Sequence, residues 1–257
     1  MNRSAAVQDV FMLFGDSITQ GGWEPDMNSF GQRLSHVYAR RLDVLNRGYS
    51  GYNTEWGRFV LQQCIDPAEV PGAPQIRVLA IWFGANDACI KPSPQHVPLP
   101  RFIENIKRMI SLGRVPANSN RKETRIILIS PPPVNTIVRK ADLESRSPPM
   151  KLDREFDITR AYADAVRDVA KGEGVAFVDV WSRIWEAAGQ NESALQKFLV
   201  DGLHLNAEGY NIMYDELIGV IAREYPEIHY DNIPYTFPAW KDINWTNPES
   251  SFKAEIV

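Results

Sequence analysis

Uninterrupted apolar runs alternate along this chain with segments in which apolar residues recur at helical spacing. The runs at 10–14, 77–83 and 125–129 are typical of strands buried on both faces, as in a parallel sheet. Two shorter segments, at 43–48 and 175–180, are also predicted to be strands. We therefore predict five strands, and a sharp break at a glycine or proline after most of them.

The segments between the strands carry apolar residues at three- and four-residue intervals, as amphipathic helices do. The first predicted helix is capped by Asn28 or Ser29 and ends at 40–41. The others are Thr54 to a stop at Pro67, 100–110, 153–171, 181–188, 193–199 and 207–224. The segment 134–150 is polar and contains prolines, so we predict a loop with room for one helical turn.

Strands and helices alternate five times without an internal repeat or a linker-like change of composition. This alternation is typical of an α/β fold with a doubly wound, mostly parallel sheet. We predict the flavodoxin-like strand order 2-1-3-4-5 and a single domain over residues 1–257. Residues 226–257 are rich in Pro, Tyr and Trp and are predicted to form an extended C-terminal tail packed on the domain.

Composition and charge exclude several classes of protein. The net charge is −4 and the sequence pI is about 5.7, whereas a nucleic-acid-binding domain needs a clustered basic face. Cys64 and Cys89 are too few and too far apart for a metal knuckle or a disulfide framework. Neither a signal peptide nor the roughly 18–20 apolar residues of a membrane span is visible. We expect a cytoplasmic protein; its oligomeric state, a homodimer included, stays open.

Three glycine-led breaks follow the first three strands, at Gly15, Gly51 and Gly84. Successive parallel strands point the same way, so these breaks are expected at one edge of the sheet, where open α/β sheets bind ligands. Ser17 stands at the end of the first strand, and His204 follows the fifth strand within reach of the same edge. The residue types that meet there match an acyl-transfer site.

Ser17 is the candidate nucleophile of this site. A serine hydroxyl needs an adjacent base, and the imidazole of His204 is the best candidate because it titrates near neutral pH. Asp201 lies three residues before His204, and it can accept a hydrogen bond from the N–H of the far ring nitrogen. The backbone N–H groups of Ser17 and Gly51 and the side-chain amide of Asn86 are candidate oxyanion-hole donors.

These residues fall into four blocks that resemble the SGNH (GDSL-type) hydrolases. The blocks are Gly15-Asp16-Ser17, Gly51, Gly84-x-Asn86-Asp87 and Asp201-x-x-His204, in the family's order. Residues 13–20, 43–54, 84–88, 96–99, 201–205 and 239–242 are most similar to the isoamyl acetate-hydrolysing esterase group within that superfamily. The resemblance implies a three-layer α/β/α fold and metal-free, cofactor-free hydrolysis of short-chain carboxylic esters, with a small-molecule ester as the partner.

Other functions use some of the same features. An acyltransferase or a thioesterase would employ the same Ser17, His204 and Asp201. A non-catalytic flavodoxin-like module would bind a nucleotide or phosphate, but G-x-x-x-x-G-K-[ST] and G-x-G-x-x-G are both absent from the sequence. The G-x-S-x-G elbow of ordinary α/β-hydrolases is absent as well.

Neighbouring residues have simpler interpretations. Asp16 and Asp87 are expected to order their turns, and Cys89 to act as a small apolar residue beside Asn86. His229, in the tail, is the rival candidate for the base. Two more residues are candidates for pocket walls, Trp23 and Trp240.

Overall fold

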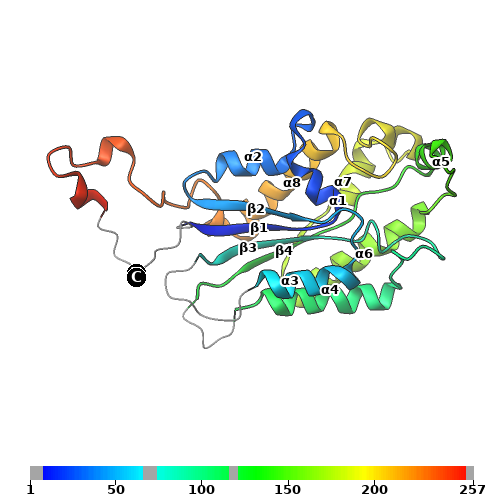
Figure 1. The fold of residues 1–257 in the computed structure, drawn as a ribbon, viewed down its shortest axis with the longest axis horizontal. Helices are drawn as coiled ribbons and strands as arrows, with labels where there is room; N and C mark the ends of the chain where they lie inside the picture. The colour runs from blue at the N-terminus through cyan, green and yellow to red at the C-terminus, as the bar shows by residue number, and fades with distance from the viewer. Residues whose placement is uncertain (1–7, 66–73, 116–120, 253–257) are drawn as a thin grey trace.

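The predicted strands form one parallel sheet in the computed structural model, which describes residues 8–65, 74–115 and 121–252 (Figure 1). The strands are β1 (Asp9–Gly15), β2 (Leu42–Gly48), β3 (Ile76–Trp82), β4 (Arg125–Ile129) and β5 (Ala176–Val178). Within the described residues their order is β2-β1-β3-β4-β5, and all neighbouring pairs are parallel. The α/β fold class and the predicted strand order are confirmed.

Helices connect the strands on both sides of the sheet. They are α1 (Ser17–Gln20), α2 (Phe30–Val37), α3 (Thr54–Cys64), α4 (Leu99–Gly113), α5 (Thr136–Ser145), α6 (Phe156–Glu173), α7 (Val180–Ala187) and α8 (Ala207–Glu224). Short 3₁₀ helices add η1 (Gly21–Trp23), η2 (Pro25–Met27), η3 (Glu192–Lys197), η4 (Pro226–Ile228), η5 (Trp240–Asp242) and η6 (Pro248–Phe252). Figure 1 shows α2, α7 and α8 on one face of the sheet and α3, α4 and α6 on the other.

The side chains of β1 explain both the layers and the uninterrupted apolar runs. Phe11 and Leu13 pack in the core beneath α2, α7 and α8, whereas Met12 and Phe14 pack in the core against α3, α4 and α6. Successive strand residues point to opposite faces, so a strand covered on both faces needs an apolar residue at every position. Burial of each such side chain contributes ~1.5–3 kcal/mol to folding.

The topology places a switch point beside β1. The chain leaves β1 for β2 on one side and then returns to β3 on the other, and β1 pairs with both. Gly15, the last residue of β1, lies in register with Trp82 at the end of β3. Segments that follow these two strands therefore emerge side by side, in the crevice where doubly wound sheets bind their ligands.

The segment 134–150, predicted as a loop, contains the ten-residue helix α5. Asn135 caps this helix, since its side chain accepts a hydrogen bond from the N–H of Val138 at 3.0 Å. The two buried residues of α5 are Arg139 and Leu143, four positions apart. The prediction was wrong because an arginine takes the place of an apolar residue on the buried face.

Other element boundaries differ in detail. The long helix predicted from 153 begins at Phe156, and the helix predicted at 193–199 is the 3₁₀ helix η3. The predicted stop of α3 at Pro67 lies outside the described residues. Within them α3 ends at Cys64.

The tail begins at the amino-terminal edge of the sheet. Tyr225 donates from its hydroxyl to the carbonyl of Ile126 in β4 at 3.1 Å. The next residues lie against the end of α2, where the N–H of Thr236 donates to the carbonyl of Arg40 at 2.8 Å. Beyond Pro238 the tail, red in Figure 1, leads away from the sheet and from the edge at which the strands end.

Candidate active site

The turn after β1 presents Ser17 at the carboxyl edge of the sheet. Gly15 is required there, since a Cβ atom would lie 2.1 Å from Thr19 Oγ1 and 2.4 Å from the carbonyl oxygen of Trp82. Asp16 accepts a hydrogen bond from the N–H of Ile18 at 2.9 Å and so caps α1. Ser17 is the first residue of that helix, with its N–H outside the helical hydrogen-bond ladder.

His204 and Asp201 meet Ser17 from a segment 187 residues away in the chain. Ser17 Oγ lies 2.9 Å from His204 Nε2, and His204 Nδ1 lies 2.9 Å from Asp201 Oδ2. The other oxygen, Asp201 Oδ1, accepts from the N–H groups of Leu203 at 3.0 Å and His204 at 2.8 Å. The three side chains therefore form a continuous hydrogen-bonded line.

The loop that carries Asp201 and His204 is closed on itself before α8. Leu199 and Leu205 form an isolated antiparallel bridge, and the N–H of Val200 donates to the carbonyl of His204 at 2.8 Å. Asn206 then caps α8 by accepting from the N–H of Gly209 at 3.1 Å. This anchoring fixes the loop even though His204 is 39% exposed.

The protonation state of Asp201 determines the tautomer of His204. Burial would raise the pKa of Asp201, but hydrogen bonds from the His204 ring and from two backbone N–H groups outweigh it and hold this pKa well below its ordinary value. Because the ionised carboxylate only accepts, His204 Nδ1 carries the proton and Nε2 is left as an acceptor toward Ser17.

Gly51 lies in a tight turn beside this line. The N–H of Tyr52 donates to the carbonyl of Tyr49 at 3.0 Å, and Gly51 has a φ of +79°, which favours glycine. The turn is tied to the end of β1, since the N–H of Tyr49 donates to the carbonyl of Gly15 at 2.9 Å. It is also tied to the segment after β3, because Asn86 Nδ2 donates to the carbonyl of Tyr52 at 2.8 Å.

Two buried carboxyl groups support these turns. Asp87 accepts hydrogen bonds from the N–H of Thr54, at 3.0 Å, and from its hydroxyl, which links the turn after β3 to α3. Burial raises the pKa of Asp87 to about 7, against the hydrogen bonds from Thr54, and raises that of Asp16 to about 6, against the Ile18 N–H. Both carboxyls therefore hold their turns together, as expected from the sequence.

The structure places two of the alternative candidates, His229 and Trp240, away from this site. His229 follows η4, at the amino-terminal edge of the sheet, and pairs with Asp231. Trp240 lies in the projecting tail and is 74% exposed. Trp23 packs against Gly31 of α2, and Cys89 is fully buried, with burial raising the pKa of its thiol.

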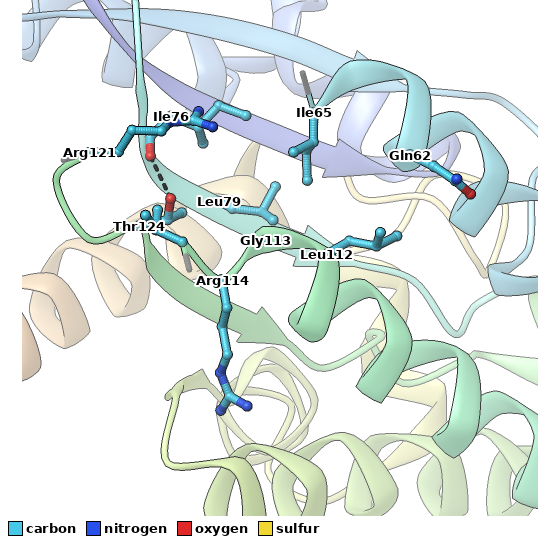
Figure 2. A pocket seen from close by; sticks show the side chains of 10 residues that line it. Gln62, Ile65, Ile76, Leu79, Leu112, Gly113, Arg114, Arg121 and Thr124 are labelled. Atoms are coloured by element: carbon cyan, nitrogen blue, oxygen red, sulfur yellow. Dashed lines mark hydrogen bonds between the residues drawn. The ribbon is translucent and has the colours of Figure 1, made fainter. Parts of the chain in front are cut away.

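A cavity of about 340 Å³ lies elsewhere, between α3, β3 and the end of α4 (Figure 2). Ile65, Leu79 and Leu112 line it, and the hydroxyl of Thr124 donates to the carbonyl of Ile76 at its rim at 2.8 Å. None of the predicted site residues lines this cavity. It is therefore separate from the serine, histidine and aspartate described above.

Three charged residues at the site were not predicted from the sequence: Arg139, Asp153 and Arg154. Arg139 contacts Asp201, and Arg154 contacts Asn86. Hydropathy assigns arginine to the surface, so the sequence offers no local signal for these buried contacts.

In the described ranges, no group of three or more His, Cys, Asp or Glu side chains could hold a metal ion. None of the helices in this part of the chain combines the length and the hydropathy that a membrane span requires.

Comparison with known proteins identifies the family. Residues 13–212 match the model of the GDSL-like Lipase/Acylhydrolase family. The chain belongs to this family. It is 34% identical over 242 residues to the isoamyl acetate-hydrolyzing esterase of Saccharomyces cerevisiae, covering 91% of this chain and 94% of the yeast protein. It is also 34% identical over 247 residues to the isoamyl acetate-hydrolyzing esterase 1 homolog of Bos taurus, covering 93% and 90%.

Solved structures agree on the fold. A carbohydrate acetylesterase family member from Sinorhizobium meliloti superposes with a TM-score of 0.60 at 18% identity, covering 84% of this chain and 98% of that one. A lipase/acylhydrolase from Enterococcus faecalis gives a TM-score of 0.57 at 21% identity, covering 89% and 98%. These two structures confirm the fold alone. The family model and the two esterases at 34% identity confirm the predicted family, and the protein is a carboxylic ester hydrolase.

Proposed function

We propose that this protein is a serine esterase that hydrolyses short-chain, acetate-type carboxylic esters through an acyl-enzyme on Ser17. The observation that carries the proposal is the unbroken line of hydrogen bonds from Ser17 Oγ through both ring nitrogens of His204 to Asp201, each of the two links 2.9 Å long. This is the geometry that nucleophile activation requires.

Acylation begins with attack of Ser17 Oγ on the ester carbonyl carbon. His204 Nε2 accepts the hydroxyl proton as the C–O bond forms, and Asp201 stabilises the resulting imidazolium while remaining ionised. The carbonyl oxygen becomes an oxyanion. When the intermediate collapses, His204 returns the proton to the leaving alcohol, and the acyl group stays on Ser17.

The oxyanion is stabilised by three donors: the N–H groups of Ser17 and Gly51 and the side-chain amide of Asn86. All three are fixed by the turns described above, so they need no reorganisation as charge develops. Water then attacks the acyl-enzyme while His204 takes its proton, and His204 returns this proton to Ser17 Oγ as the bond to the acyl group breaks and the carboxylic acid leaves. The 39% exposure of His204 favours access of water to this step.

The names of the relatives support the proposed substrate class. Proteins named isoamyl acetate-hydrolyzing esterase align with more than nine-tenths of this chain, and their name specifies an acetate ester. We therefore expect p-nitrophenyl acetate to be hydrolysed with a higher kcat/KM than p-nitrophenyl octanoate. A profile that is flat, or that rises beyond octanoate, would contradict the short-chain assignment.

The proposal is tested by replacing the nucleophile. Ser17→Ala should abolish turnover of p-nitrophenyl acetate, while Ser145→Ala, at an exposed serine at the end of α5, should leave it unchanged. Retained turnover in a folded Ser17→Ala variant would refute the proposal. Two further assays test the alternatives. An acyltransferase would transfer the acyl group to an added alcohol or thiol in preference to water. A thioesterase would hydrolyse a thioester faster than the matching ester.

A further inference from the structure

A chain of buried charged groups runs behind the site from Asp201 to Asn86. Arg139 donates from Nη1 to Asp201 Oδ2 at 2.8 Å, and from Nε and Nη2 to the two oxygens of Asp153 at 3.1 and 3.0 Å. Asp153 also accepts a hydrogen bond from Arg154. Arg154 in turn donates from Nη2 to Asn86 Oδ1 at 2.8 Å. The chain thus joins the residue that orients the base to an oxyanion-hole donor.

The burial of this chain argues for a specific role. The side chains of Arg139 and Arg154 are 5% and 2% exposed, and Asp153 and Asp201 balance their charges. Burial would raise the pKa of Asp153, but the bond from Arg139 and the charge of Arg154 outweigh it and lower this pKa, so the carboxyl is ionised. Buried ion pairs cost several kcal/mol of desolvation per ion and add little net stability over apolar residues. Stability alone therefore gives a weak reason for four charges here.

The contacts of Asn86 show what Arg154 does. A guanidinium has no acceptor, so the amide atom facing Arg154 must be the oxygen. The carbonyl of Tyr52 has no donor, so the atom facing it must be the nitrogen, which lies 2.8 Å away. The amide is thereby fixed in one orientation, with its second N–H hydrogen available to an oxyanion. Arg154 also holds the backbone of this turn, since its Nε donates to the carbonyl of Ala85 at 2.9 Å.

We propose that Arg154 is a positioning residue that orients the Asn86 amide as an oxyanion donor, and that Asp153 and Arg139 hold it in register with Asp201. The inference rests on the proposed function, because Asn86 must be an oxyanion donor for its orientation to affect the rate. Without Arg154 the Tyr52 carbonyl alone would hold the amide, so the amide could turn about that one contact and its second N–H would no longer be aimed at the developing negative charge.

A double-mutant cycle between Arg154 and Asn86 tests this coupling with p-nitrophenyl acetate. Asn86→Ala should lower kcat by about 10²–10³-fold, the usual effect of losing one oxyanion donor. Arg154→Met should lower kcat by roughly 10–10²-fold, with KM nearly unchanged, because the oxyanion forms only in the transition state. The double variant should fall no more than ~3-fold below Asn86→Ala, since Arg154 has nothing left to orient.

Two further variants separate positioning from loss of the fold. Arg154→Lys keeps the charge but cannot donate to Ala85, Asn86 and Asp153 together, so it should show the same non-additive loss even if Arg154→Met folds poorly. Arg167→Met, on α6 and 49% exposed, is the matched control and should keep wild-type kcat. Unfolding curves for every variant check that the protein is folded in the assay.

The outcomes separate this inference from the proposed function. Two results would overturn the positioning role and leave the proposed esterase function standing. One is a loss of kcat in the double variants equal to the product of the losses in the single variants. The other is an Arg154 variant that raises KM with kcat unchanged. Absence of Ser17-dependent turnover in the wild type would overturn the proposed function, and the positioning role with it.

Discussion

Replacement of Asp201 by asparagine should convert His204 to the wrong tautomer. The backbone N–H groups of Leu203 and His204 both point at Oδ1, so the amide oxygen of the new asparagine will take that place. Its NH₂ group then faces His204 Nδ1, which must become an acceptor. The ring proton moves to Nε2, and this nitrogen can no longer accept the proton of Ser17.

The contacts of Asp201 set the size of the effect. A change of tautomer of this kind lowers kcat about 10⁴-fold in a serine protease triad, or ~5.5 kcal/mol of transition-state stabilisation. A smaller effect on stability adds to it. Arg139 Nη1, 2.8 Å from Oδ2, would meet a donor in place of an acceptor, which costs ~1–3 kcal/mol of unfolding free energy.

The assay is kcat for p-nitrophenyl acetate at neutral pH, together with urea unfolding of the same samples. Asp215→Asn, at an aspartate on α8 that is 73% exposed, is the matched control and should match the wild type in both measurements. A folded Asp201→Asn variant with kcat within tenfold of the wild type would refute the assignment of Asp201 as the residue that orients His204.

Two further predictions concern the supports of the site. Gly51→Ala places a Cβ on a residue with φ of +79°, so it should lower the unfolding free energy by ~1 kcal/mol, as measured by urea unfolding; a variant as stable as the wild type would contradict a turn that requires glycine at this position. Asp87 has a folded-state pKa of about 7, raised above its unfolded value, so its contribution to stability is present at low pH and is lost as pH rises through 7. The Tm of the wild type should therefore fall between pH 4 and pH 7 more than that of Asp87→Asn, as measured by scanning calorimetry; equal slopes would contradict a buried, titrating Asp87.

Much of the fold could be predicted because its signals are local. An uninterrupted apolar run such as 10–14 can be buried on two faces only in a covered strand, and the alternation with helices then limits the topology. The glycines at the strand ends pointed to one edge of the sheet. The meeting of Ser17 with His204 across 187 residues followed from that edge.

The charged chain behind the site could not be predicted for a physical reason. Arg139 and Arg154 can be buried because each donates hydrogen bonds to carboxylate or carbonyl groups of distant segments. A local sequence pattern does not indicate which distant residues will provide those acceptors. Arg139 is also the reason why α5 was not predicted, because the buried face of this helix consists of Arg139 and Leu143. Polar groups that are buried in pairs are thus the part of this molecule that hydropathy cannot reveal.

Activation of Ser17 by His204 can be measured by covalent labelling. The protein is treated with a serine-directed organophosphate, digested, and the modified peptide is located by mass spectrometry. We expect a single phosphorylated site at Ser17 in the wild type and loss of that label in a folded His204→Ala variant. A label on another serine, or equal labelling of Ser17 without His204, would contradict this expectation.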